Sequence, residues 1–137
     1  MTLVLDPSVV AGWFIADESS PYTLAARAAV VAEGAVVPGL WSYEVTNMFL
    51  MAERRRRISG ADVSLALESL AAMPIELRPP PTMPEALGLS RLAREHGLSA
   101  YDASYLEAAV RTRSRLATLD HDLRRAADRA GVPRFSD

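Results

Sequence analysis

The sequence predicts an α/β fold: a three-layer α/β/α sandwich around a mostly parallel central sheet. Short apolar runs typical of buried strands alternate along the whole chain with segments whose apolar residues recur at helical spacing. This alternation indicates right-handed crossovers between parallel strands, with helices on both faces of the sheet. The chain has 137 residues and half of them are hydrophobic, so we expect a single domain over residues 1–137.

The predicted strands are short runs of apolar or β-branched residues. They cover residues 2–5, 35–38, 75–77 and 116–119, with a last edge strand at residues 132–135. Pro38 cannot donate a ladder hydrogen bond, so we expect the chain to leave the sheet there. The strands at 2–5 and 116–119 stop at Asp6 and Asp120, respectively.

Helices are expected between the strands. Their approximate ranges are 7–14, 22–33, 40–57, 60–73, 82–96 and 99–110, with a last helix that ends at Ala130. Pro7 suits the first turn of a helix, and Ser59 with Asp62 has the spacing of a capping box. Prolines 79–81 indicate a turn and not a domain linker, because helical patterning resumes directly after them.

Composition excludes several classes of function. The chain has no Lys and no Cys, which removes Schiff-base chemistry, the P-loop, thiolate catalysis and Cys-based zinc sites. The net charge of -2 and pI near 5.7 give no overall basic footprint for nucleic acid. The N-terminus has no basic segment before Asp6, and no apolar run approaches the roughly 20 residues of a membrane span. We therefore expect a cytoplasmic protein without a membrane partner.

Four acids fall where a parallel sheet would bring them to one edge. Asp6, Glu44, Asp102 and Asp120 each lie at the end of a strand or in the first turn of a helix. Each has a simpler explanation, as a helix cap or a first-turn charge that suits the helix dipole. Taken together, however, converging carboxylates repel one another unless a cation lies among them. Ligation by oxygen alone suits Mg²⁺ or Mn²⁺.

Small polar residues accompany the acids. Ser8, Asn47 and Thr118 lie two or three positions from an acid and would orient carboxylates or bound water. For Ser8 and Thr118, an ordinary capping role is nearly as well supported by the sequence.

The segments LDPSV, PGLWSYEVTN, GLSAYDASYLEAA and LATLDHDL, in this order and over almost the whole length, resemble the PIN-domain nucleases. The resemblance is closest to the VapC-type ribonuclease toxins of toxin–antitoxin pairs. It implies a PIN-like fold in which Asp6, Glu44, Asp102 and Asp120 are catalytic, metal-binding acids, with Asp122 as a further acid that only some members have. It also implies Mg²⁺- or Mn²⁺-dependent cleavage of RNA, homodimerisation, and inhibition by a cognate antitoxin protein.

Other interpretations remain open from the residues. Arg54, Arg55, Arg56 and Arg57 either contact phosphates of the RNA or stabilise the C-terminus of their helix. The alternatives to a toxin are a housekeeping nuclease acting on RNA or DNA, and a non-catalytic module that binds a protein through residues 40–57 and 60–73. A phosphatase or receiver domain would need a lysine that the chain lacks.

Overall fold

The computed structural model describes residues 2–136, and within them four strands form an all-parallel sheet. The strands are β1 (Leu3–Leu5), β2 (Ala35–Pro38), β3 (Ile75–Arg78) and β4 (Arg115–Ala117). Their order is β3-β2-β1-β4, so the first strand lies inside the sheet between β2 and β4. In the register, Leu3 pairs with Ala35 on one side and with Arg115 on the other.

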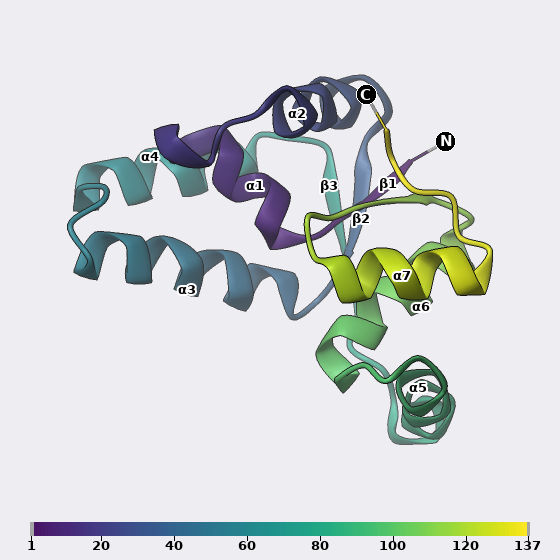
Figure 1. The fold of residues 1–137 in the computed structure, drawn as a ribbon. Coiled ribbons are helices and arrows are strands. Elements are labelled where there is room, and N and C mark those ends of the chain that lie inside the picture. Colours follow the sequence, from purple (N-terminus) through teal and green to yellow (C-terminus); the bar gives the residue numbers. More distant parts are fainter. Residues whose placement is uncertain (1, 137) are drawn as a thin grey trace.

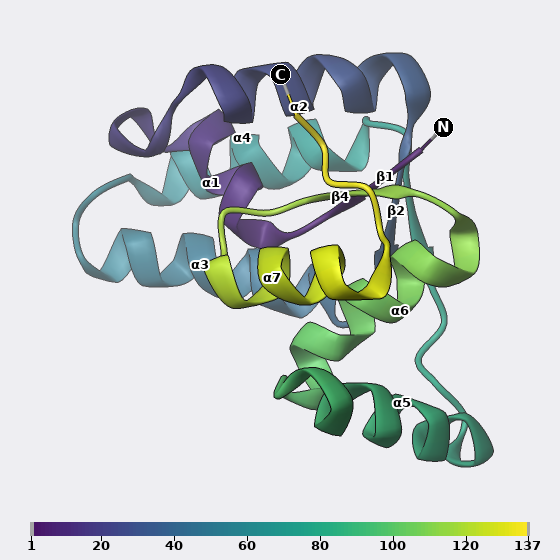
Figure 2. The ribbon, with the colours of Figure 1, turned by 45° about the vertical axis from the view of Figure 1, so that its right-hand side comes forward.

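Helices cover both faces of this sheet, as expected for a three-layer α/β/α sandwich. They are α1 (Pro7–Phe14), α2 (Pro21–Glu33), α3 (Trp41–Arg54), α4 (Gly60–Ala71), α5 (Met83–His96), α6 (Ala100–Thr112) and α7 (His121–Ala130), with a 3₁₀ turn at Ala16–Glu18. In Figure 1, α2 lies on one side of the sheet, and α6 crosses the other with α7 beside it. Helices α3 and α4 form a pair that extends to one side, and α5 packs on α6 far from the strands (Figure 2).

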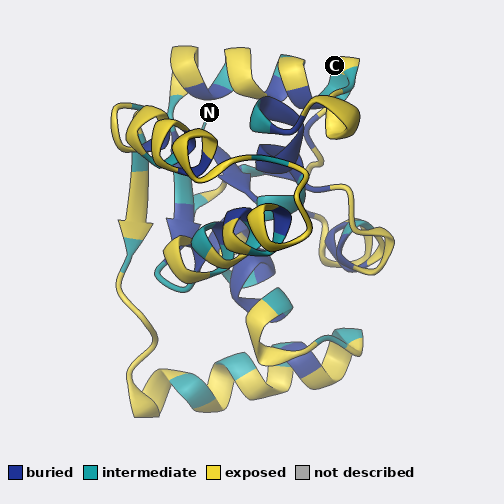
Figure 3. Cartoon of the chain, turned by 90° about the vertical axis from the view of Figure 1, so that its left-hand side faces the viewer, coloured by how far each residue is buried: buried dark blue, intermediate teal, exposed yellow. Residues whose placement is uncertain are grey.

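The hydrophobic core surrounds β1. Leu3, Val4 and Leu5 are all fully buried, because a parallel strand covered on both faces has no solvent side on which to place a polar residue. Figure 3 shows how burial varies over the molecule: the middle of the sheet is buried, whereas most of α5 is exposed. Only Ala93 of α5 is buried, so this helix contributes little to the core.

Three expected boundaries were wrong. The helix predicted over residues 40–57 ends at Arg54, and Arg56 has a φ of 59°, in the left-handed region that breaks a helix. The strand predicted at 116–119 is Arg115–Ala117, because the carbonyl of Thr118 accepts from Arg124 and the N–H of Leu119 donates to Ser8 instead of continuing the ladder. The last edge strand is reduced to a single parallel bridge between Leu116 and Arg134.

Helices α1 and α2 approach each other closely at Gly12. A Cβ atom on Gly12 would lie 2.4 Å from the Oγ1 of Thr23, which is fully buried. The indole N–H of Trp13 donates a hydrogen bond of 2.6 Å to the carbonyl of Thr23. The rotation of α1 about its axis is therefore set by α2.

Among the helices of residues 2–136, none combines the length and the apolar character that crossing a bilayer requires.

Candidate functional site

The carboxyl ends of β1 and β4 lie side by side and carry the first and last predicted acids. The N–H of Asp6 donates to the carbonyl of Ala117 at 3.0 Å, which joins the two strand ends. Asp6 then caps α1, because its Oδ2 accepts from the N–H of Ser8 at 3.3 Å. Asp120 caps α7 in the same way, with its Oδ1 accepting from the N–H groups of Asp122 and Leu123. The capping roles of both residues are thus real, and each uses one carboxylate oxygen.

Ser8 and Thr118 connect the two strand ends. The hydroxyl of Thr118 donates to Asp6 Oδ2 at 3.0 Å and accepts from the N–H of Asp120 at 3.0 Å. The hydroxyl of Ser8 also donates to Asp6 Oδ2, and it accepts from the N–H of Leu119 at 3.0 Å. Within residues 2–136, no hydrogen bond reaches Asp6 Oδ1. One oxygen of Asp6 is held firmly, and the other is left for a ligand.

Glu44 is held by a residue from another part of the chain. Glu44 lies in the first turn of α3 and is partly buried. The phenol of Tyr105 in α6, which is fully buried, donates a hydrogen bond to Glu44 Oε1. Tyr105 was not predicted from the sequence, since its spacing only marks it as part of the buried face of α6.

Ser99 begins a capping box at the start of α6, and Asp102 does not complete it. The N–H of Asp102 donates to the hydroxyl of Ser99 at 3.1 Å. At the starts of α2, α4 and α5 the third helical residue also returns a side-chain bond to the cap, but the carboxylate of Asp102 does not. The capping interpretation therefore explains the backbone N–H of Asp102, whereas its carboxylate makes no return bond to the N–H of Ser99. The hydroxyl of Ser99 does act on this carboxylate, since it offsets part of the rise that burial causes in the pKa of Asp102.

Three of the acids perturb one another. Burial, and to a lesser extent the charge of Asp102, raises the pKa of Asp6. Burial also raises the pKa of Glu44, with further contributions from Asp6 and Asp102. The pKa of Asp102 is raised by burial first and then by the charge of Asp120. These shifts place the four acids, together with Asp122, in one electrostatic neighbourhood at the edge of the sheet.

The chemistry of this neighbourhood fits a hard divalent cation. In the described part of the chain, the ion pairs join other residues, and none involves Asp6, Glu44, Asp102 or Asp120. Asp6, Glu44 and Asp102 are partly buried, an uncommon arrangement for carboxylates without a cationic partner because burial favours the neutral form, whereas Asp120 is exposed. As placed, however, no three Asp, Glu or His side chains of residues 2–136 come close enough together to form a ready metal site.

The remaining predicted residues are less closely connected with the acids. Asn47 lies one turn after Glu44 on α3 and is exposed. Asp122 is also exposed, and its Oδ1 forms an ion pair of 2.8 Å with Arg125. Asp122 is therefore paired locally, although its charge also helps to raise the pKa of Asp102.

The four arginines lie at the other end of α3. Arg54 is ten residues after Glu44, about 15 Å along the helix at 1.5 Å per residue. Arg57 pairs with Asp17 at 2.8 Å and with Glu18 at 3.1 Å. A cavity of about 400 Å³ lies beside this end of the helix. Its lining includes Met48, Met51, Arg55 and Arg57 together with Ser8 and Leu119, which neighbour the acidic site, but none of the four acids.

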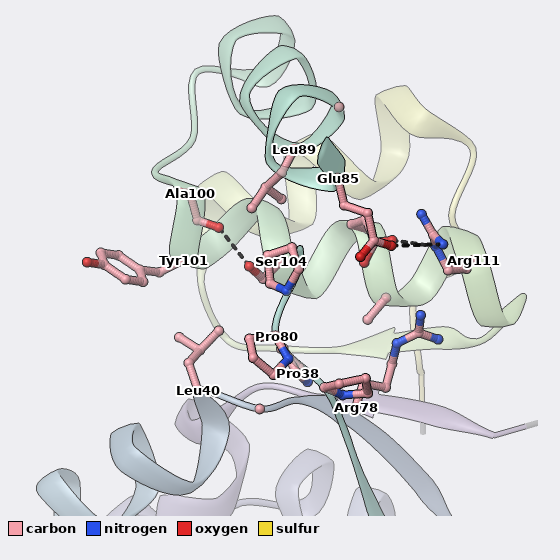
Figure 4. A pocket seen from close by; sticks show the side chains of 16 residues that line it. Pro38, Leu40, Arg78, Pro80, Glu85, Leu89, Ala100, Tyr101, Ser104 and Arg111 are labelled. Atoms are coloured by element: carbon pink, nitrogen blue, oxygen red, sulfur yellow. Dashed lines mark hydrogen bonds and ion pairs between the residues drawn. The ribbon is translucent and has the colours of Figure 1, made fainter. Parts of the chain in front are cut away.

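A larger cavity, of about 570 Å³, lies elsewhere. It is formed by α5, α6, the end of β2 and the proline turn after β3, and it contains none of the four acids (Figure 4). Glu85 and Arg111 form an ion pair of 3.7 Å at its wall.

Comparisons with known proteins agree with this architecture. Residues 3–129 match the PIN domain. Ribonuclease VapC3 of Pyrobaculum aerophilum is 31% identical over 123 residues, which is 90% of this chain and 92% of the relative. The crystal structure of PAE2754 from Pyrobaculum aerophilum superposes with a TM-score of 0.69 at 25% identity, over 92% of this chain and 84% of that one.

A second solved structure shows the same fold. FitAcB from Neisseria gonorrhoeae superposes with a TM-score of 0.63 at 18% identity, over 98% of this chain and 97% of that one. The two superpositions show that the overall fold is shared with both solved structures. On the sequence match and the relative together, the chain belongs to the PIN-domain family, among its VapC-type members.

Proposed function

We propose that this protein is a divalent-metal-dependent endoribonuclease that acts as the toxin of a toxin–antitoxin pair. The observation that carries the proposal is the group of four acids at the carboxyl edge of the sheet, none of them neutralised by an ion pair within residues 2–136. The relative named as a ribonuclease supports RNA as the substrate.

Asp6, Glu44, Asp102 and Asp120 would hold Mg²⁺ or Mn²⁺, which suits oxygen ligands. When bound, such an ion polarises the phosphoryl group and lowers the pKa of a bound water. The chain's own residues would keep these carboxylates in place for the ion, since Ser8 and Thr118 both hold Asp6 Oδ2. Tyr105 holds Glu44 in the same way.

Two of the predicted residues have weaker support. Asn47 remains a candidate for orienting water near Glu44, because it lies one turn away and no hydrogen bond within residues 2–136 occupies its side chain. For Asp122 we propose an auxiliary role at most, since Arg125 already pairs with it.

Arg55 is the best placed of the four arginines to contact substrate phosphates. It lines the 400 Å³ cavity that begins at Ser8, and within the described residues it takes part in no ion pair. Arg57 lines the same cavity, but its guanidinium is held by Asp17 and Glu18. An RNA strand that enters the acidic site would pass Arg55 along α3.

The nuclease proposal is tested by Mn²⁺-dependent cleavage of RNA with purified protein. We expect cleavage by the unchanged protein, loss of cleavage on addition of EDTA, and loss of cleavage in Asp102→Asn with the fold retained. Asp128→Asn is the matched control, because Asp128 is an exposed acid of α7 that pairs with Arg134. Full activity of Asp102→Asn, with metal still required, would contradict the four-acid site.

The toxin proposal needs a separate test in cells. Expression of the protein alone is expected to slow growth, and co-expression of the product of a small neighbouring gene is expected to restore it. We also propose a homodimer, which sedimentation of the purified protein would show. If growth is unaffected although RNA is cleaved in vitro, a housekeeping nuclease is the better description.

A further inference from the structure

The main-chain carbonyl of Thr118 is held from outside the acidic site. Nε of Arg124, in α7, donates to this carbonyl at 2.8 Å. The phenol of Tyr22, in α2, donates to the same oxygen in a longer bond of 3.5 Å. The guanidinium carbon of Arg124 also lies 5.2 Å from the centre of the Tyr22 ring, a cation–π distance.

Arg124 differs from three other arginines of the chain in the kind of partner that it has. Arg125, Arg115 and Arg134 each form an ion pair, whereas Arg124 forms none within residues 2–136. Its charge faces a neutral carbonyl and an aromatic ring. The ring of Tyr22 is itself supported by Phe135, whose centroid lies 5.6 Å away in an edge contact.

Thr118 is the residue on which two of the proposed metal ligands depend. Its hydroxyl donates to Asp6 and accepts from the N–H of Asp120, so both bonds require one position and one rotamer of this side chain. Thr118 comes directly after β4, where the sheet ladder no longer restrains the backbone. A second anchor on the backbone of Thr118 is therefore needed to keep its hydroxyl between the two acids.

We propose that Arg124 is a positioning residue of the acidic site. By binding the carbonyl of Thr118 and stacking on Tyr22, it holds the loop that aligns Asp6 with Asp120. Its effect on metal binding rests on the proposed function, but its effect on the loop does not. Lysine cannot replace it, because an ammonium group lacks both the fixed Nε–H direction and the planar face that stacks on the ring.

The first experiment follows the loop directly in metal-free protein. Amide hydrogen exchange by NMR reports on the N–H groups of Leu119 and Asp120, which are bound to the hydroxyls of Ser8 and Thr118. In Arg124→Lys we expect both amides to exchange about tenfold faster, the effect of losing one ordinary hydrogen bond. Tyr22→Phe keeps the ring and loses only the long bond, so we expect a smaller change.

The second experiment measures the affinity for Mn²⁺ by calorimetry, without substrate. Loss of a residue that orients a metal ligand typically costs about 10- to 100-fold in affinity, and Arg124→Lys is expected to fall in this range. Arg129→Lys is the matched control on α7. Within residues 2–136, Arg129 makes no side-chain hydrogen bond or ion pair. Arg129→Lys should therefore change neither the amide exchange rates nor the Mn²⁺ affinity.

The outcomes separate the two proposals. Faster exchange in Arg124→Lys, in a protein that binds no Mn²⁺, would support the positioning role and contradict the metal site. Unchanged exchange at Leu119 and Asp120 would overturn the positioning role, whatever the result of the Mn²⁺ titration. Equal effects of Arg124→Lys and Arg129→Lys would also overturn it, because the cause would then be a general effect of replacing an arginine of α7 and not the loss of the contact with Thr118.

Discussion

Replacing Asp6 by asparagine separates the demands of folding from those of metal binding. The amide oxygen of asparagine can take the place of Asp6 Oδ2 as the acceptor for Ser8 and Thr118, so the cap of α1 is kept. What disappears is one negative charge in a partly buried position beside other carboxylates. In the absence of metal, we therefore expect Asp6→Asn to be more stable than the unchanged protein.

The sign follows from the pKa of Asp6, which burial and the charge of Asp102 raise. A carboxyl whose pKa is higher in the folded than in the unfolded state destabilises the fold once it is ionised. The gain in folding stability from Asp6→Asn is thus present at neutral pH. It disappears as the pH falls from the raised pKa of Asp6 to the unfolded value of about 3.9.

The expected gain is on the order of 1 kcal/mol, the usual size of a single-residue effect. For a chain of 137 residues, the unfolding entropy is roughly 0.3 kcal/mol per degree, so the melting temperature should rise by about 3 °C. Excess Mn²⁺ should reverse the order of the two proteins, because a ligand that binds only the folded state stabilises it by mass action.

Thermal melting with EDTA and with Mn²⁺, at pH 7.5 and pH 4, measures these shifts. Asp62→Asn serves as the control with the opposite sign, since hydrogen bonds from Ser59 lower the pKa of Asp62 and its charge stabilises the fold. If Asp6→Asn melts below the unchanged protein at pH 7.5 in EDTA, the ionised form of Asp6 stabilises the fold through its hydrogen bonds, and the reasoning from burial and repulsion is refuted.

Three further predictions concern single side chains. Tyr105→Phe removes the hydrogen-bond donor to Glu44 at the start of α3 and should reduce the Mn²⁺ affinity, measured by calorimetry, about 10- to 100-fold. An unchanged affinity would show that this bond is only structural. Asp120→Asn should abolish RNA cleavage, whereas Asp122→Asn should lower it by less than about tenfold; equal losses in both would restore Asp122 to the site. Arg55→Gln should weaken RNA binding and reduce the slope of log affinity against log salt by about 1, and Arg57→Gln should leave that slope unchanged.

Much of the fold was predictable because its signals are local. The apolar run at residues 35–38 became β2, and Ser59 with Asp62 formed the expected capping box at the start of α4. The end of α3 was not predictable in this way, since Arg54 to Arg57 all favour helix by composition. Arg57 instead turns to pair with Asp17 and Glu18, some forty residues earlier in the chain.

The site shows the same division between local and distant causes. The caps at Asp6 and Asp120 and the bonds from Ser8 to Asp6 and from Asp120 to Thr118 follow from spacing along the chain. The bond from Thr118 to Asp6 joins residues 112 positions apart and depends on the pairing of β1 with β4. The bond between Tyr105 and Glu44 joins residues 61 positions apart, and nothing in the periodicity of α6 distinguishes Tyr105 from an ordinary core residue. Arg124 was missed for the same reason, because its partner is a main-chain carbonyl that sequence patterns do not reveal.

The close approach of α1 and α2 has a consequence for how the protein can evolve. Residue 12 has no room for a Cβ while residue 23 is threonine, so the two positions should vary together among relatives. A larger residue at position 12 would be accepted only with a smaller one at position 23. Because α1 begins directly after Asp6, an uncompensated change would turn the helix and move that carboxylate. Selection that keeps Asp6 in place would therefore also constrain Gly12 and Thr23, although neither residue would contact a substrate.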